Sequence, residues 1–272
     1  MNVVPLEIRT VSQAASKPIA QSADVSPAKI AQVKMTPAIV RKTEVILRAP
    51  VPGKAGASVV PAVLPIAGPF TSPVLCTEEK RLKLTAMDRD EVSICPKCRL
   101  CETRTRTVFG EGDVDSKIFF IGEGPGENED LTGRPFVGRA GELLGRMIVG
   151  MGLTREQVFI ANIVKCRPPN NREPAPEEVA ACTPYLERQL ELIRPRVIVT
   201  LGKPAAHHML QVKTAMGQLR GTWHEWRGIK LMPTFHPAYI LRCYTDAVRG
   251  QVWSDLQQVM EEIGLPKGKR NA

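Results

Sequence analysis

Apolar and polar positions change their period several times along the chain, and these changes predict its secondary structure. Dense apolar runs that stop at a glycine or a polar residue predict four buried strands, at Lys117–Gly122, Val158–Val164, Val197–Leu201 and Lys230–Phe235. Apolar residues at helical spacing predict helices at Gly138–Met151, at Pro176–Ile193, after Gly202 through Leu210, and at Ala247–Ile263. Strands that alternate with helices indicate an α/β fold of three layers, in which helices cover both faces of a central four-stranded parallel sheet.

The first part of the chain has a different composition. Residues 1–85 are rich in Ala, Val and Pro, proline recurs from Pro5 to Pro73, and Phe70 is the one aromatic residue. Such a segment cannot offset its chain entropy by burial, so we expect a disordered extension, either dispensable or bound to a protein partner. A short charged helix at Glu78–Ser93 is expected to lead into a folded domain at 86–265. A basic tail follows at 266–272.

The charge of the chain favours a polyanionic partner without identifying it. Lys and Arg number 37 against 28 Asp and Glu, which gives a net charge of +9. Ribosomal proteins, membrane-surface proteins and many enzymes share such a surplus. The sequence contains no apolar run of 18 residues and no signal peptide, so we expect a cytoplasmic protein without a membrane partner.

The cysteines suggest a metal site. In a reducing compartment, clustered cysteines bind metals more often than they form disulfides. Cys95 and Cys98 have chelate spacing, Cys101 forms a second C-x-x-C with Cys98, and Cys166 and Cys182 lie downstream. Four thiolates from two segments suit tetrahedral zinc or a [4Fe–4S] cluster, and spacing does not separate these. Alternatively, Cys166 and Cys182 are ordinary buried cysteines.

Three unusual segments follow the ends of predicted strands. They are GEGPGENED at 122–130, KCRPPNNR at 165–172 and HPAYILR at 236–242. Because ligands bind at the carboxyl ends of parallel strands, we expect these segments around one cleft. The glycine-rich segment matches no nucleotide-binding motif, and its acids repel anions. A glycine-walled turn beside the Glu123 carboxylate instead suits a flat neutral ring and a developing cation.

Three further side chains at this edge are candidates for binding such a ring. Phe136 offers a stacking face, or is a core residue. The Asn162 amide both donates and accepts hydrogen bonds, or it caps the chain locally. His236 can hydrogen-bond an oxygen that gains negative charge, or it is structural.

Taken together, four strings resemble the family 4 uracil-DNA glycosylases, the iron–sulfur members of their superfamily. They are CPKCRLCETRTRTVFGEG at 95–112, IGEGPGENEDLTGRPFVGRAGELL at 121–144, NIVKCRPPNNREP at 162–174 and HPAYILR at 236–242. The resemblance covers about residues 90 to 262. It implies a monomeric enzyme associated with the nucleoid that flips uracil out of single- or double-stranded DNA. The enzyme hydrolyses the N-glycosidic bond as the first step of base excision repair.

The resemblance also implies roles for individual residues. A [4Fe–4S] cluster, in preference to zinc, is expected on Cys95, Cys98, Cys166 and Cys182, without Cys101. The catalytic residues are expected to be Glu123 and His236, with the division of roles between Glu123 and Asp130 left open. Uracil is expected to contact Gly122, Gly124, Pro125, Phe136 and Asn162. DNA is expected to contact Arg139, Arg167, Arg172, Arg220, Ile240, Leu241 and Arg242, with Ile240 and Leu241 entering the duplex.

Two alternatives from other classes remain at this point. A non-catalytic nucleic-acid-binding protein with a structural zinc or iron–sulfur site predicts DNA binding without an abasic product. A redox protein predicts a cluster that cycles at mild potentials without base release.

Overall fold

The computed structural model describes residues 68–266, which contain a six-stranded sheet. The strands follow the order β1-β3-β2-β4-β6-β5. Four central strands pair in parallel, as the apolar runs predict: β2 (Ile118–Gly122), β3 (Phe159–Asn162), β4 (Val197–Leu201) and β6 (Ile229–Thr234).

The predicted number of strands is wrong, because each edge of the sheet carries one more. β1 (Glu111–Gly112) pairs antiparallel with β3, and β5 (His224–Trp226) pairs antiparallel with β6. These edge strands are two and three residues long, too short for an apolar alternation to appear in the sequence.

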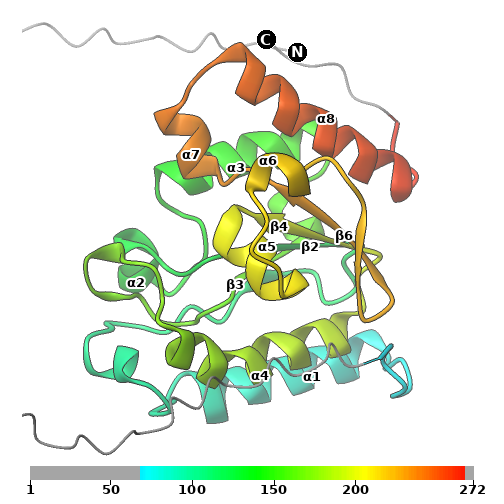
Figure 1. The fold of residues 1–272 in the computed structure, drawn as a ribbon. Helices are drawn as coiled ribbons and strands as arrows, with labels where there is room; N and C mark the ends of the chain where they lie inside the picture. The colour runs from blue at the N-terminus through cyan, green and yellow to red at the C-terminus, as the bar shows by residue number, and fades with distance from the viewer. Residues whose placement is uncertain (1–67, 267–272) are drawn as a thin grey trace, which may run out of the picture. The chain divides into compact units, whose positions relative to one another are not determined.

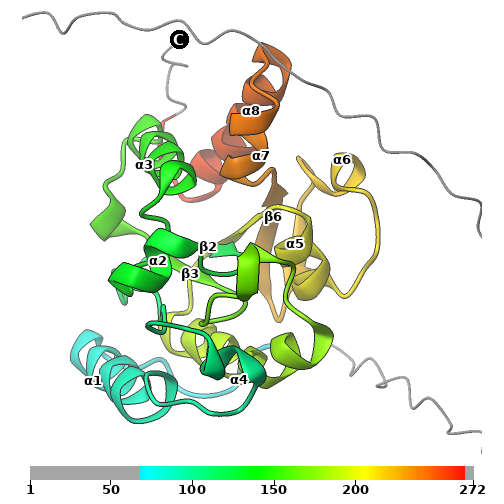
Figure 2. The same cartoon turned by 90° about the vertical axis from the view of Figure 1, so that its left-hand side faces the viewer.

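Helices cover both faces of the sheet (Figure 1). One face packs against α3 (Arg139–Gly150), α7 (Pro237–Arg242) and α8 (Asp246–Glu262). The other packs against α1 (Thr77–Met87), α4 (Pro176–Ile193) and α5 (Lys203–Leu210). The side chains of β2 alternate between the two cores, with Phe120 in the first and Phe119 in the second. Figure 2 shows the same layers from the side, with α3 and α8 on one side of the sheet and α1 and α4 on the other. The predicted three-layer α/β fold is confirmed.

Shorter helices connect these elements. They are a π-helix at Asp88–Val92, 3₁₀ turns at Arg99–Glu102, Arg155–Gln157 and Pro169–Asn171, and the helices α2 (Glu127–Thr132) and α6 (Met216–Leu219).

The connections between strands leave a crevice at the carboxyl ends of the central strands. The crossover from β2 to β3 runs through α3, and the crossover from β4 to β6 runs through α5, on opposite faces. Because β2 and β4 are neighbours, their following segments diverge and leave room at the carboxyl ends of the strands.

The folded part begins earlier than the predicted boundary at residue 86. Helix α1 begins at Thr77, and its Lys80 and Leu84 are buried, so residues between 77 and 85 belong to the domain. Most of the predicted disordered extension, residues 1–67, lies outside the described residues, and so does the prediction that it binds a protein partner. Residues 267–272 of the predicted basic tail also lie outside them. Within 68–266, every helix is too short or too polar to cross a membrane.

Candidate active site

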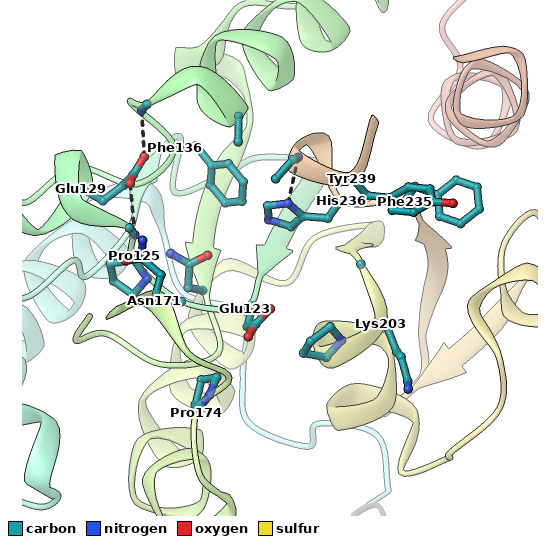
Figure 3. A pocket seen from close by; sticks show the side chains of 18 of the residues that line it. Glu123, Pro125, Glu129, Phe136, Asn171, Pro174, Lys203, Phe235, His236 and Tyr239 are labelled. Atoms are coloured by element: carbon teal, nitrogen blue, oxygen red, sulfur yellow. Dashed lines mark hydrogen bonds between the residues drawn. The ribbon is translucent and has the colours of Figure 1, made fainter. Parts of the chain in front are cut away.

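A cavity of about 920 Å³ lies at the carboxyl ends of the central strands (Figure 3). Each parallel strand contributes to its lining: Glu123 follows β2, Asn162 ends β3, Gly202 follows β4 and His236 lies just beyond β6. The strand-end segments therefore surround one cleft, as their positions in the sequence predict.

Asn162 and Phe136 are both buried and line the cavity, and we call the space beside them the slot. Asn162 is 1% exposed, and its Oδ1 has no hydrogen-bond partner among the described residues. Gly122 pairs with Asn162 across β2 and β3, and a Cβ on Gly122 would lie 2.3 Å from that Oδ1 and 2.6 Å from Cζ of Phe136. Gly124 and Pro125 line the adjoining wall. A buried acceptor without a donor, beside an aromatic face, fits a flat ring that brings an N–H group.

Phe136 is held in an uncommon backbone conformation. Its φ is +51°, in the left-handed region. Arg155 Nη1 donates to the carbonyl of Phe136 at 3.0 Å, and Glu111 fixes Arg155 through an ion pair of 2.6 Å. Gly141 permits the close backbone approach, since a Cβ there would lie 1.9 Å from the same carbonyl. These contacts direct the Phe136 ring toward His236, with centroids 5.7 Å apart.

His236 is a neutral donor at pH 7. Its Nδ1 accepts a hydrogen bond from the Ala238 amide at 3.1 Å, which leaves the proton on Nε2. Burial, together with the charge of Arg242, lowers the pKa of His236 to about 4. A neutral imidazole with a fixed tautomer can donate to an oxygen that gains negative charge.

Glu123 lies half-buried in the cavity. Burial, assisted by the charge of Glu173, raises the pKa of Glu123 above its ordinary value. Among the described residues, no hydrogen bond or ion pair engages its carboxylate. The carboxylate is therefore available to a ligand.

Glu129, which the sequence did not single out, organises the loops around the slot. Its Oε1 accepts hydrogen bonds from the amides of Val137 at 2.8 Å and Gly138 at 2.9 Å, and its Oε2 accepts one from Gly126 at 3.1 Å. It occupies the third position of α2, where a glutamate commonly caps a helix, and that spacing is the signal in the sequence.

Asp130 does not reach the cavity, so a shared catalytic role with Glu123 is not supported. Its buried carboxylate accepts hydrogen bonds from the amides of Thr105 at 2.9 Å and Arg106 at 3.4 Å. Asp130 thus anchors the backbone at Thr105 and Arg106, just after the segment that carries Cys95, Cys98 and Cys101.

Cations lie at the mouth of the cavity. Arg139 and Arg242 line it, and so does Lys203, which the sequence did not indicate. None of these three side chains forms a hydrogen bond or an ion pair within residues 68–266. They are free to meet phosphates.

Arg172 and Arg167 are already engaged by side chains of the protein. Arg172 also lines the cavity and makes a two-pronged ion pair with Glu178, at 2.8 and 2.6 Å. Arg167 lies outside the lining and donates to Oδ1 of Asn171 at 2.8 Å.

Two further predicted DNA contacts, Arg220 and Ile240, are engaged within the protein. Arg220 forms a buried ion pair with Asp255, so its guanidinium is not free for a phosphate. Ile240 is 3% exposed and packs in the core beneath α3 and α8, so it cannot enter a duplex in this conformation. Leu241 is half-buried and retains an accessible face.

The predicted cysteine ligands lie together away from the cleft. Cys95, Cys98, Cys166 and Cys182 line one small cavity, whereas Cys101 does not. No three His, Cys, Asp or Glu side chains of the described part converge as closely as a bound metal ion requires. Burial raises the pKa of Cys98, Cys166 (to about 11) and Cys182, so these sulfurs need a cation to be held as thiolates.

Hydrogen-bond donors surround the same sulfurs. The contacts are Arg104 Nη1 to Cys166 Sγ at 3.2 Å, the Lys165 amide to Cys182 Sγ at 3.2 Å, and the Tyr185 hydroxyl to Cys95 Sγ at 3.4 Å. Such donors stabilise the negative charge of metal-bound sulfur, so the chemistry of this set fits a cluster.

Comparison with known proteins identifies the family to which this fold and this cavity belong. The chain belongs to the uracil DNA glycosylase superfamily, whose family model matches residues 109–257. The type-4 uracil-DNA glycosylase of Thermotoga maritima is 47% identical over 185 residues, which cover 67% of this chain and 96% of that protein. The type-4 enzyme of Saccharolobus solfataricus is 46% identical over 183 residues, with 64% and 84% covered. That of Sulfurisphaera tokodaii is 44% identical over 188 residues, with 66% and 84% covered.

Proposed function

We propose that this protein is a uracil-DNA glycosylase, which flips uracil out of DNA and hydrolyses its N-glycosidic bond. The observation that carries the proposal is the buried Oδ1 of Asn162, which has no partner in the described part of the chain. The N3–H of uracil supplies the missing donor, while the amide nitrogen of Asn162 faces a carbonyl of the base. Phe136 stacks on the ring, and Gly122, which has no side chain, lets Phe136 and Asn162 take up these positions.

Two groups act on the charges that develop as the bond breaks. The departing uracil gains negative charge, which the Nε2–H of neutral His236 stabilises. The sugar gains positive charge, and the carboxylate of Glu123 stabilises it or orients the attacking water. The product is a strand with an abasic site.

The DNA backbone binds at the mouth of the cavity. Arg139, Arg242 and Lys203 neutralise phosphates there, which positions the strand without reading its sequence. Extrusion of uracil costs a few kcal/mol and is cheapest at a mispair or in a single strand. Because one chain supplies every wall of the slot, we propose that the enzyme acts as a monomer.

A [4Fe–4S] cluster on Cys95, Cys98, Cys166 and Cys182 is part of this proposal. The four sulfurs share one cavity, and the hydrogen-bond donors around them support the assignment. Cys95 and Cys98, Cys166 after β3, and Cys182 in α4 would hold the cluster, which would tie these three segments together and supply no step of the hydrolysis.

The direct test is incubation of the protein with single- and double-stranded oligonucleotides that contain one uracil, followed by alkaline cleavage. The proposal predicts strand scission at the uracil position and none with thymine. A non-catalytic DNA-binding protein would bind both oligonucleotides without scission, and binding would survive Glu123→Ala. A redox protein would give neither binding nor scission.

A further inference from the structure

The uracil slot accounts for only the inner part of the cavity. At about 920 Å³, the cavity is near the upper end of the roughly 300–1,000 Å³ that encloses a drug-sized ligand, and one uracil is smaller than such a ligand. Figure 3 shows Phe235, Tyr239 and Lys203 on the opposite side of His236 from Phe136. This outer part of the cavity has no role in the uracil chemistry.

We propose that the outer part is a subsite for the nucleotide next to the uracil, whose base stacks on the Tyr239 ring, with Phe235 packed behind that ring. Its phosphate lies between Lys203 and Arg242. The inference rests on the proposed function and extends the substrate from one flipped base to a stretch of single strand.

The stacking surface is the Tyr239 ring, which packs against Phe235. The centroids of the two rings lie 4.9 Å apart with an interplanar angle of 35°, and both side chains line the cavity while remaining partly exposed. Aromatic side chains beside a cationic groove are how proteins hold single-stranded nucleic acid without reading its sequence, because every base has a π face.

Arg220 and Asp255 hold the Phe235 ring in place. The guanidinium of Arg220 lies 5.7 Å from the Phe235 ring centroid, and Arg220 is held by the buried carboxylate of Asp255. The hydroxyl of Thr234, the residue before Phe235, donates to Asp255 at 2.6 Å. Phe235, held in this way, supports the Tyr239 ring, which then loses little freedom when a base stacks on it.

The charges beside the rings suit a phosphate. Lys203 and Arg242 are exposed, line the same cavity and have no ion-pair partner among the described residues. This combination of rings and free cations distinguishes a nucleotide from an apolar ligand. The base beside uracil leaves its stack cheaply only in a single strand, so the subsite contributes more to single-stranded than to double-stranded substrates.

The test combines enzyme variants with altered substrates. Single-stranded oligonucleotides carry one uracil, and a tetrahydrofuran spacer replaces the base on one side of it or the other. For the wild type, loss of the stacked base is expected to raise KM about 10-fold on one side only. Tyr239→Ala is expected to raise KM on the intact strand by a similar factor and to show no further rise with the spacer.

Two variants control for general damage. Tyr239→Phe keeps the ring and is expected to retain the wild-type dependence on the neighbouring base. Tyr244 is 62% exposed and does not line the cavity, so Tyr244→Ala is expected to retain it too. Thermal denaturation of each variant checks the fold.

The inference is overturned if the spacer leaves the wild-type KM unchanged, or raises it equally in the wild type and Tyr239→Ala. Fluorescence anisotropy with the same oligonucleotides reports the stacking even when no uracil is released. A protein that binds with the expected dependence but releases no uracil contradicts the proposed function and supports the subsite. Uracil release without the dependence does the reverse.

Discussion

Gly122 and Asn162 face each other across the ends of two parallel strands, so closely that a Cβ on Gly122 would lie 2.3 Å from Oδ1 of Asn162. Gly122 does not line the cavity itself, and its lack of a side chain lets Asn162 and Phe136 pack against the end of β2. Both neighbours that a methyl group would strike, Asn162 and Phe136, are buried and cannot move aside cheaply.

Gly122→Ala is therefore expected to lower kcat/KM for uracil release by about 100-fold or more, because it displaces the amide and the stacking ring together. Single-turnover kinetics on a uracil oligonucleotide measures the loss. Gly145→Ala is the matched control, since a Cβ there meets no atom within 4 Å and lies in the middle of α3. Equal activity in the two variants would contradict the close approach.

Asn162→Ala is expected to lower kcat by about 10²–10³, the usual cost of losing one donor that faces developing charge. Its melting temperature is expected to stay near the wild-type value, because the wild type already carries the cost of a buried acceptor without a partner. Kinetics and thermal denaturation on the same sample separate these effects. The exposed Asn128 is a matched control, and Asn128→Ala is expected to change neither quantity.

Glu123 is expected to set the acid limb of the pH profile. Burial and the neighbouring Glu173 raise the pKa of Glu123, so its carboxylate takes up a proton at a higher pH than a free glutamate does. Activity that needs the carboxylate falls as the pH falls through this raised pKa. Glu123→Gln is expected to lower kcat by about 10²–10⁴ and to flatten the limb. An unchanged limb in Glu123→Gln would assign it to another group.

The substitution Glu123→Gln also has a predicted effect on stability. Because the folded-state pKa is raised, the proton binds more tightly to the folded than to the unfolded protein, and stability is lost as the pH rises through the raised pKa. Glu123→Gln removes this loss, so the variant is expected to melt at or above the wild-type temperature at pH 7. A clear drop in melting temperature would indicate a structural role for the carboxylate.

The folded protein is expected to lose stability in acid because two of its histidines are buried in the neutral form. The pKa values of His236 and His208 are each lowered to about 4, in both cases mainly by burial. Their ordinary pKa is about 6.5, so between these values the unfolded chain binds more protons and stability falls as the pH falls. Each histidine accounts for at most about 3 kcal/mol of this loss of stability.

The two histidines are distinguished by their effect on catalysis. His208→Gln is expected to reduce the pH slope of the unfolding free energy with little change in kcat, because His208 lies outside the cavity lining. His236→Gln reduces both. Denaturant unfolding between pH 4 and 7 gives the slope, and a wild-type stability independent of pH over that range would contradict the buried, neutral state of both rings.

Substitution of single cysteines distinguishes the proposed cluster ligands from Cys101. Cys98→Ala and Cys166→Ala are expected to lose the visible absorbance and the iron content of the purified protein, and to lower its melting temperature. Cys101 stands outside the shared cavity, so Cys101→Ala is expected to keep both. Iron and zinc analysis of each preparation is the measurement. Zinc in place of iron in the wild type would contradict the assigned cluster.

The central strands and long helices could be predicted from the sequence because each carries its own period. The helix at Pro176–Ile193 begins with proline and two glutamates and ends at Arg194, whose φ is +51°. The strand-end cleft followed from topology alone. The edge strands β1 and β5 were missed because two or three residues carry no period.

The direction in which individual side chains point could not be predicted from the sequence. Asp130 and Glu129 are neighbours on α2, and only the phase of that helix decides that Glu129 organises the slot while Asp130 holds Thr105. The partner of Arg220 is 35 residues away at Asp255, a pairing that no local pattern signals. Ile240 lies in a motif that implies DNA contact, yet its turn of α7 faces the core.

Release of free uracil by the intact protein is the most direct test of the proposed glycosylase activity. Chromatography with mass detection, applied to a uracil oligonucleotide after incubation with cluster-loaded wild-type protein and with Asn162→Ala, measures both the free base and the abasic strand. We predict equal amounts of free uracil and abasic strand from the wild type, and about 10²–10³ slower release from the variant. No free uracil from wild-type protein that retains its cluster and its fold would contradict the account.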